Sequence, residues 1–101
     1  MIKGIGLDDE GRCRHWHSFH DVVANRCAQC DEFYACYQCH DAMVTHHFCP
    51  MPLTDERVAV LCGACHFGMT GQMYLKANYY CPKCHHPFNN QCARHIEIYF
   101  S

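Results

Sequence analysis

Apolar residues occur in short runs separated by polar turns, and three of these runs are predicted to be strands. The first, Arg57–Leu61, leads directly into Cys62. The second, Tyr79–Tyr80, leads into a cysteine in the same way. In the last segment of the sequence apolar and polar residues alternate, which is typical of a half-buried strand. Its apolar positions are Ile96, Ile98 and Phe100.

A short helix is predicted over Gln72–Ala77. Thr70 can cap its first turn through the side-chain hydroxyl, and Asn78 is a residue type that often ends a helix. The most apolar run, Val58–Cys62, is soon interrupted by glycine and is far shorter than the roughly 18 residues of a membrane helix. We therefore expect no membrane-spanning segment. The length of 101 residues corresponds to one domain.

The cysteine and histidine content changes this picture. Eleven residues are Cys and ten are His, and a short chain with more than about 8–10% Cys holds either disulfides or metal. The odd number of Cys argues against a closed disulfide framework, and the acidic segment Asp8–Glu10 does not fit a signal peptide. We therefore expect a reducing, cytoplasmic compartment in which paired Cys bind metal. The mitochondrial intermembrane space is the alternative.

Two Cys-x-x-Cys pairs in the second half predict a structural zinc site. Fifteen residues separate Cys62/Cys65 from Cys81/Cys84, which matches the spacing of a zinc ribbon. Each pair can bring two sulfurs to about 2.3 Å from one ion, and two pairs complete a tetrahedron. Gly63 permits the tight turn of the first pair.

The first half carries eight further candidate ligands, enough for two tetrahedral ions. Cys39 and His40 are adjacent, so their side chains diverge and should bind different ions. An interleaved and a nested grouping both satisfy this condition, and in the nested grouping the two pairs Cys27/Cys30 and Cys36/Cys39 share one ion. The eight candidates are Cys13, His15, Cys27, Cys30, Cys36, Cys39, His40 and His46.

The order of these residues resembles the CHY-type zinc finger family. The matching motifs are Cys13-x-His15-Trp16, Cys27/Cys30, Tyr34-x-Cys36-x-x-Cys39-His40-Asp41, His46, Cys62/Cys65 and Cys81/Cys84. The closing segment resembles the small, stand-alone branch of that family through Phe88-Asn89, Cys92-x-x-His95 and Tyr99-Phe100. The resemblance implies one CHY-type domain over residues 12–100, with two interleaved sites in 12–47 and a ribbon-like site in 56–100. It implies these first two ligand sets: Cys13, His15, Cys36 and Cys39; and Cys27, Cys30, His40 and His46.

Several Cys and His residues remain outside this assignment. His17 could replace His15, and His47 could displace His46. A fourth site could use Cys92 and His95, which lack two obvious partner ligands. We expect Cys49, beside a proline, to be an ordinary loop thiol. An apolar floor between the sites is expected from the aromatic residues Trp16, Phe33, Tyr34, Tyr79 and Tyr80.

The predicted fold is a small zinc-stabilised one, with irregular loops, short β-hairpins, one short helix and three structural zinc sites. A structural zinc contributes on the order of 10–16 kcal/mol, because ligands and metal meet only in the folded state. A small domain has a net stability of only about 5–15 kcal/mol. Three ions would therefore outweigh the apolar core.

We expect a non-catalytic, monomeric zinc-binding module that acts through protein contacts. The resemblance implies Cys-rich clients whose zinc or reduced thiols it handles. Nucleic-acid binding is not expected, because eight basic against ten acidic residues leave a net charge of −2. A zinc hydrolase would need a general base, and we expect Asp31, Glu32 and Asp41 to be solvated turn residues. The alternatives are a thiol-disulfide oxidoreductase that uses the Cys-x-x-Cys pairs, or a substrate-binding module of a ubiquitin-ligase system.

Overall fold

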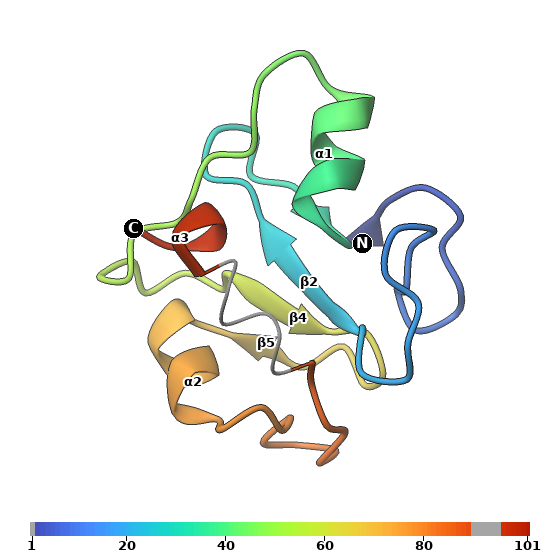
Figure 1. Cartoon of the computed structure of the whole chain (residues 1–101). Coiled ribbons are helices and arrows are strands. Elements are labelled where there is room, and N and C mark those ends of the chain that lie inside the picture. The colour runs from blue at the N-terminus through green and yellow to red at the C-terminus, as the bar shows by residue number, and fades with distance from the viewer. Residues whose placement is uncertain (1, 90–95) are drawn as a thin grey trace.

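A computed structural model describes residues 2–89 and 96–101, and it is built around a five-stranded sheet (Figure 1). The strand order is β1-β3-β2-β4-β5, so β2 lies at the centre. All neighbouring strands are antiparallel except β1 and β3, which run parallel. The strands are β1 (Ile2–Lys3), β2 (Val23–Arg26), β3 (Phe33–Tyr34), β4 (Val60–Cys62) and β5 (Gly68–Met69).

Three short helices flank the sheet in the described part of the chain. Figure 1 shows α1 (Tyr37–Met43) and α2 (Gly71–Lys76) near opposite ends of the molecule, and α3 (Ile96–Tyr99) beside the C-terminus. Helix α2 agrees with the predicted helix, and its N-cap is Thr70, whose hydroxyl accepts a hydrogen bond from Met73 N at 3.2 Å. Helices α1 and α3 add to the single helix expected.

Cysteine makes up much of the buried interior. One apolar cluster joins the centre of the sheet to the C-terminal segment, and it includes Val22, Val60, Met51, Met69 and Phe100. Cys27, Cys62 and Cys81 are fully buried in the same cluster. A second, smaller cluster consists of Cys13, Cys36 and Cys39, packed against Ile5, Trp16 and Ala35. This confirms the fold class, in which sulfur-rich sites replace a large hydrocarbon core.

Three of the local predictions need correction. The alternating segment expected as a final strand is the helix α3 followed by a single bridge between Met51 and Phe100. The strand expected over Arg57–Leu61 is shorter and starts later, at Val60, and all three residues of β4 pair with β2. In place of a strand over Tyr79–Tyr80, Tyr79 lies in a turn and Tyr80 forms a single bridge with Pro87; Asn78 and Tyr79 both have positive φ angles, of 55° and 64°.

The aromatic floor forms only in part. Tyr34 is buried and packs edge-to-face against His40, with ring centroids 4.8 Å apart. Tyr79 and Tyr80 are instead exposed to 37% and 54% on the surface. Within residues 2–89 and 96–101, the helices are all too short to cross a membrane.

Candidate metal centres

Site 3 consists of the four sulfurs of Cys62, Cys65, Cys81 and Cys84. Cys62 ends β4, and the chain turns through Gly63 to place the second sulfur beside it. The Sγ atoms of Cys62 and Cys84 lie 3.8 Å apart, and those of Cys65 and Cys81 lie 3.6 Å apart. Sulfurs bound at about 2.3 Å to a tetrahedral zinc would lie about 3.8 Å apart. Since a disulfide bond measures only about 2.0 Å, the geometry is that of a metal site.

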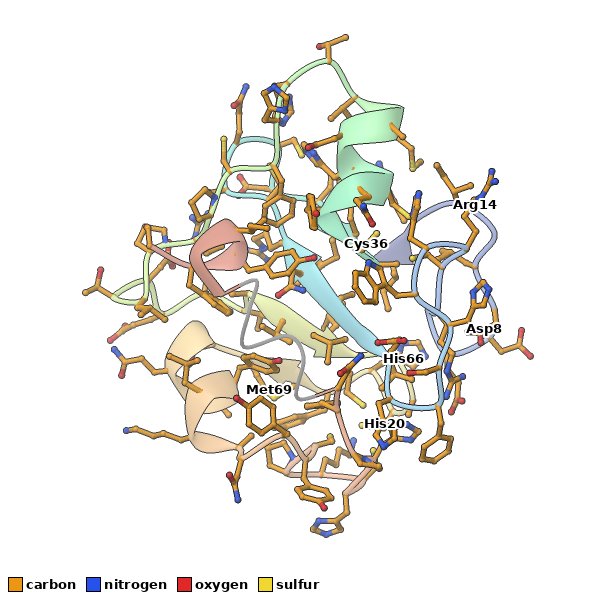
Figure 2. All side chains as sticks on the ribbon, in the orientation of Figure 1. Asp8, Arg14, His20, Cys36, His66 and Met69 are labelled. Atoms are coloured by element: carbon orange, nitrogen blue, oxygen red, sulfur yellow. The ribbon has the colours of Figure 1, made fainter. Side chains whose placement is uncertain are left out.

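Site 1 consists of Cys13, His15, Cys36 and Cys39. The Nδ1 atom of His15 lies 3.5 Å from the sulfur of Cys36 and 3.4 Å from that of Cys39. The sulfurs of Cys13 and Cys36 are 3.5 Å apart. Figure 2 shows Cys36 at the base of α1, beside the loop that carries the first two ligands. Two segments distant in sequence therefore meet at this site.

Site 2 consists of Cys27, Cys30, His40 and His46. The two Nε2 atoms of its histidines are 3.1 Å apart. The sulfur of Cys27 lies 3.6 Å from His46 Nε2, and that of Cys30 lies 3.8 Å from His40 Nε2. Tetrahedral zinc with these ligands would separate a sulfur from a nitrogen by about 3.6 Å. The arrangement of the first half is thus interleaved, not nested.

Helix α1 separates the two interleaved sites. Cys36 caps the helix, and its sulfur accepts a hydrogen bond from Cys39 N at 3.3 Å. Cys39 then contributes to site 1, whereas the next residue, His40, contributes to site 2. Consecutive side chains on a helix point about 100° apart, which is why neighbours can bind different ions.

Backbone N–H groups point at several of the sulfurs. Ile5 N donates to Cys39 at 3.3 Å, and Cys49 N donates to Cys27 at 3.4 Å. In site 3, Lys83 N and Cys84 N both donate to Cys81, at 3.4 and 3.5 Å. Such bonds stabilise thiolate sulfur, which is the form that binds metal.

The pKa values of the thiols show how closely the sulfurs are crowded. The hydrogen bond shared with Cys36 is the main cause that lowers the pKa of Cys13 to about 5, and the same contact raises the pKa of Cys36. In site 3, burial is the main cause that raises the pKa of Cys62. Burial would also raise the pKa of Cys81, but backbone hydrogen bonds from Cys84 and Lys83 outweigh it and lower the pKa to about 7. In each of these two sites the pKa of one thiol is lowered while that of another is raised, and binding of a divalent cation favours the thiolate form of all of them.

Asp41 orients a ligand of site 2, a role that the sequence analysis missed. Its Oδ1 atom lies 2.9 Å from His40 Nδ1 and accepts a hydrogen bond from Phe48 N at 2.8 Å. Burial would raise the pKa of Asp41, but the hydrogen bonds from His40 and Phe48 outweigh it and lower the pKa. A carboxylate on the far nitrogen of a ligating histidine fixes the ring for the metal. The signal in the sequence was an aspartate directly after a ligand histidine.

The other candidate ligands lie outside the three sites. The ring of His17 contacts the backbone oxygen of Cys13 instead of joining site 1. The His47 side chain is 98% exposed, and its ring lies 3.5 Å from Asp41 Oδ2. Cys49 is a half-buried thiol that contacts Gln29 Oε1 at 3.2 Å. The predicted fourth pair, Cys92 and His95, lies outside the described residues.

The donor sets identify the ion as zinc. Site 1 offers three thiolates and one imidazole, site 2 two of each, and site 3 four thiolates. Such four-coordinate sets favour zinc over harder ions that prefer oxygen. All four ligands in each site come from the protein, and their ligand atoms lie within 4.8 Å of one another. The chain therefore has three zinc sites of the closed, structural kind.

The sequence is similar to those of curated proteins over nearly the full length of the chain. Helper of Tim protein 13 of Saccharomyces cerevisiae is 39% identical over 103 residues, which cover 98% of this chain and 89% of that protein. Helper of Tim protein 13 of Kluyveromyces lactis is 40% identical over 101 residues, covering 99% of this chain and 88% of that one. The chain belongs to the Helper of Tim protein 13 family.

The resemblance to the Helper of Tim protein 13 family runs through all three zinc sites, because the alignments span almost the whole chain. An uncharacterized protein of Schizosaccharomyces pombe is also 46% identical over 100 residues, which cover 98% of this chain and 88% of that protein. No model of a protein family matches the chain, and no solved structure matches it either.

Proposed function

We propose that this chain is a non-catalytic zinc-handling protein that exchanges zinc with reduced, Cys-rich client proteins. The observation that carries the proposal is the use of cysteine: nine of the eleven Cys residues lie in the three zinc sites. A chain that binds three ions through so many thiolates competes for zinc with any client rich in free thiols. Removing zinc from such a client leaves its thiols free for oxidation.

We further propose that the protein acts on Tim proteins in the mitochondrial intermembrane space, as a monomer. The name of its relatives, Helper of Tim protein 13, supports a Tim client and favours this compartment over the cytoplasm expected from the sequence. The interleaved order of ligands in sites 1 and 2 supports placing the family among CHY-type zinc fingers.

The arrangement of the thiols supports a non-enzymatic role. All four Cys-x-x-Cys pairs lie inside zinc sites, where thiolates bound to metal are poorly available for disulfide exchange. We therefore expect the zinc-loaded chain to show no insulin-reduction activity. Rapid insulin reduction by the loaded chain would favour the oxidoreductase alternative.

Zinc exchange with a client tests the proposal directly. The zinc-loaded full chain is mixed with a reduced, zinc-free Tim protein, and native mass spectrometry follows the number of ions on each partner. We expect zinc to redistribute between the two within minutes. A Tim variant with its Cys replaced by Ser serves as the control and should take no zinc. If the chain keeps three ions beside the intact client, the proposal fails.

A further inference from the structure

The ligands of the three zinc sites differ in their exposure to solvent. In site 3, Cys62 and Cys81 are fully buried, Cys65 is half-buried and Cys84 is exposed. Cys84 is the exposed one among the nine cysteines of the three sites. Site 3 therefore presents two reachable sulfurs, one from each Cys-x-x-Cys pair.

The other two sites are less open to an incoming thiol. In site 1 the residues Cys13, Cys36 and Cys39 are at most 3% exposed, although His15 is exposed. In site 2, Cys27 and His40 are fully buried, and Cys30 and His46 are half-buried. A thiol that displaced His15 would reach an ion whose remaining ligands are all enclosed, so stepwise transfer would stop there.

The electrostatic surroundings of Cys84 favour an approaching thiolate. Lys83 lies between the two cysteines of its pair and is exposed. The segment 72–89 contains two lysines and no acidic residue. A positive charge beside a binding site increases the rate at which an anionic partner arrives.

A hollow and exposed aromatic residues adjoin this pair. A cavity of about 360 Å³ is lined by Tyr79, Tyr80, Pro87 and Phe88, together with the polar residues His20 and Asn78. Phe19 is 61% exposed and packs on His86, with ring centroids 4.5 Å apart. The hollow lies on the same hairpin as Cys84, since Tyr80 and Pro87 form a bridge on either side of the pair.

We propose that site 3 is the site through which zinc is exchanged, and that Cys84 is the ligand displaced first. This inference rests on the proposed zinc exchange and names the site that performs it. A client thiol gives up its proton and approaches as a thiolate, its sulfur forms a bond to zinc, the bond from zinc to Cys84 breaks, and the proton passes to the released Cys84 sulfur. Charge and ligand number are unchanged in this step, and Cys65 follows as the next reachable sulfur.

Mapping the thiols released during exchange tests the site. The zinc-loaded chain is mixed with a reduced, zinc-free zinc-ribbon peptide that has four cysteines, and free thiols are alkylated briefly after one ion has moved. We expect peptide mapping to find label on Cys62, Cys65, Cys81 and Cys84. Label on the cysteines of site 1 or site 2 would overturn the inference, while zinc exchange itself would stand.

Alkylation of the loaded chain alone separates this inference from the proposed function. With N-ethylmaleimide and no acceptor, we expect Cys84 to be modified first among the nine zinc-site cysteines, and the ion count to fall from three to two. If no zinc ever reaches a thiol acceptor, the proposed function fails, and the order of alkylation still decides which site is open. First modification in site 1 or site 2 contradicts the inference.

Charge reversal beside the ligands provides a matched pair of variants. Lys83→Glu should slow transfer to the thiol peptide by about 3- to 10-fold at low salt, because it removes the positive charge beside Cys84. Arg14→Glu is the control, because Arg14 holds the corresponding place between Cys13 and His15 of site 1 and extends into solvent (Figure 2). Both variants should retain three ions. A slower rate in the Arg14 variant alone would assign exchange to site 1.

Discussion

At the scale of single residues, neighbours in sequence have opposite surroundings at site 2. His46 is half-buried and its Nε2 atom faces Cys27 at 3.6 Å. His47 extends into solvent with its side chain 98% exposed. Both are histidines beside a zinc site, so the backbone path after α1 determines which of them becomes a ligand.

Replacing these histidines one at a time should separate ligand from bystander. His46→Ala removes one of the four ligands of site 2, and we expect the ion count at limiting zinc to fall from three to two. His47→Ala is the matched control and should keep all three ions. Native mass spectrometry against a competing chelator measures both. Equal zinc loss in the two variants would contradict the ligand assignment.

Gly63 is a second residue whose identity is fixed by its surroundings. A Cβ atom added there would lie 1.9 Å from the backbone oxygen of Glu10 and 2.9 Å from that of Val22. These contacts involve backbone atoms, so a larger residue would have to displace the backbone at Glu10 and Val22.

We expect Gly63→Ala to destabilise the zinc-loaded protein by about 3 kcal/mol, at the upper end for overpacking. Thermal unfolding at saturating zinc measures the effect. The control is Gly68→Ala, because there the added atom meets only the side chain of Val58, at 3.0 Å. A melting temperature in the Gly63 variant as high as in the control would show that the close approach is unimportant.

At the scale of elements, short helices and turns position the ligands. Helix α1 has seven residues and supplies Cys39 to one site and His40 to another. An isolated helix of this length is unstable in water. Zinc ligation and packing of Tyr37 and Tyr99, whose ring centroids are 6.2 Å apart, therefore stabilise it.

Helix α2 has no zinc ligand and depends more on its cap. Thr70→Ala removes the hydroxyl that accepts from Met73 N, and we expect a loss of about 1 kcal/mol in the free energy of unfolding. Zinc content should not change. Thr54→Ala, in an exposed turn, is the control and should stay within about 0.5 kcal/mol of the parent. Chemical denaturation at saturating zinc compares them; an equal loss in both would argue against the cap.

The sequence predicts an element well where its conformation is set by neighbouring residues, and poorly where it is set by contacts with residues distant in sequence. The spacing of Cys62/Cys65 and Cys81/Cys84 predicts site 3, because each pair is one turn. The Thr70 cap predicts α2 for the same reason. The alternation of Ile98 and Phe100 is misleading, because the backbone N–H of Tyr37 donates to the Tyr99 hydroxyl at 3.0 Å and the helix α3 supports that contact.

The order of strands could not be derived from the sequence. Strands β1 and β3 have two residues each and pair in parallel across a long connection. Runs this short have no measurable periodicity. The choice between His15 and His17 likewise depends on the fold of the loop, because both lie on the same side of an extended chain.

At the scale of the whole molecule, each zinc site joins segments that are distant in sequence. The chain has a radius of gyration of 12.0 Å. Of the ten largest fully buried side chains among the described residues, six are zinc ligands: Cys13, Cys27, Cys39, His40, Cys62 and Cys81. Removing the metal would leave buried thiols crowded against one another. We therefore expect the folded state to depend on the ions.

Chelation should unfold the protein. With excess EDTA and a reductant, we expect near-UV circular dichroism and the cooperative melting transition to disappear, because each structural zinc contributes on the order of 10–16 kcal/mol. Adding back three equivalents of zinc should restore both signals. A metal-free chain that kept its dichroism and melting temperature would show that the apolar core alone is sufficient.

The crossing of sites 1 and 2 along the chain constrains how the protein matures. The last ligand of site 1 along the chain is Cys39, and the last ligand of site 2 is His46. During synthesis or translocation, both ligand sets are therefore completed within a few residues of each other. A chain passing through a narrow translocation pore must travel as an extended strand without its ions. If the chain reaches its proposed compartment through such a pore, it binds its ions after passage, and the loaded molecule is too compact to pass back.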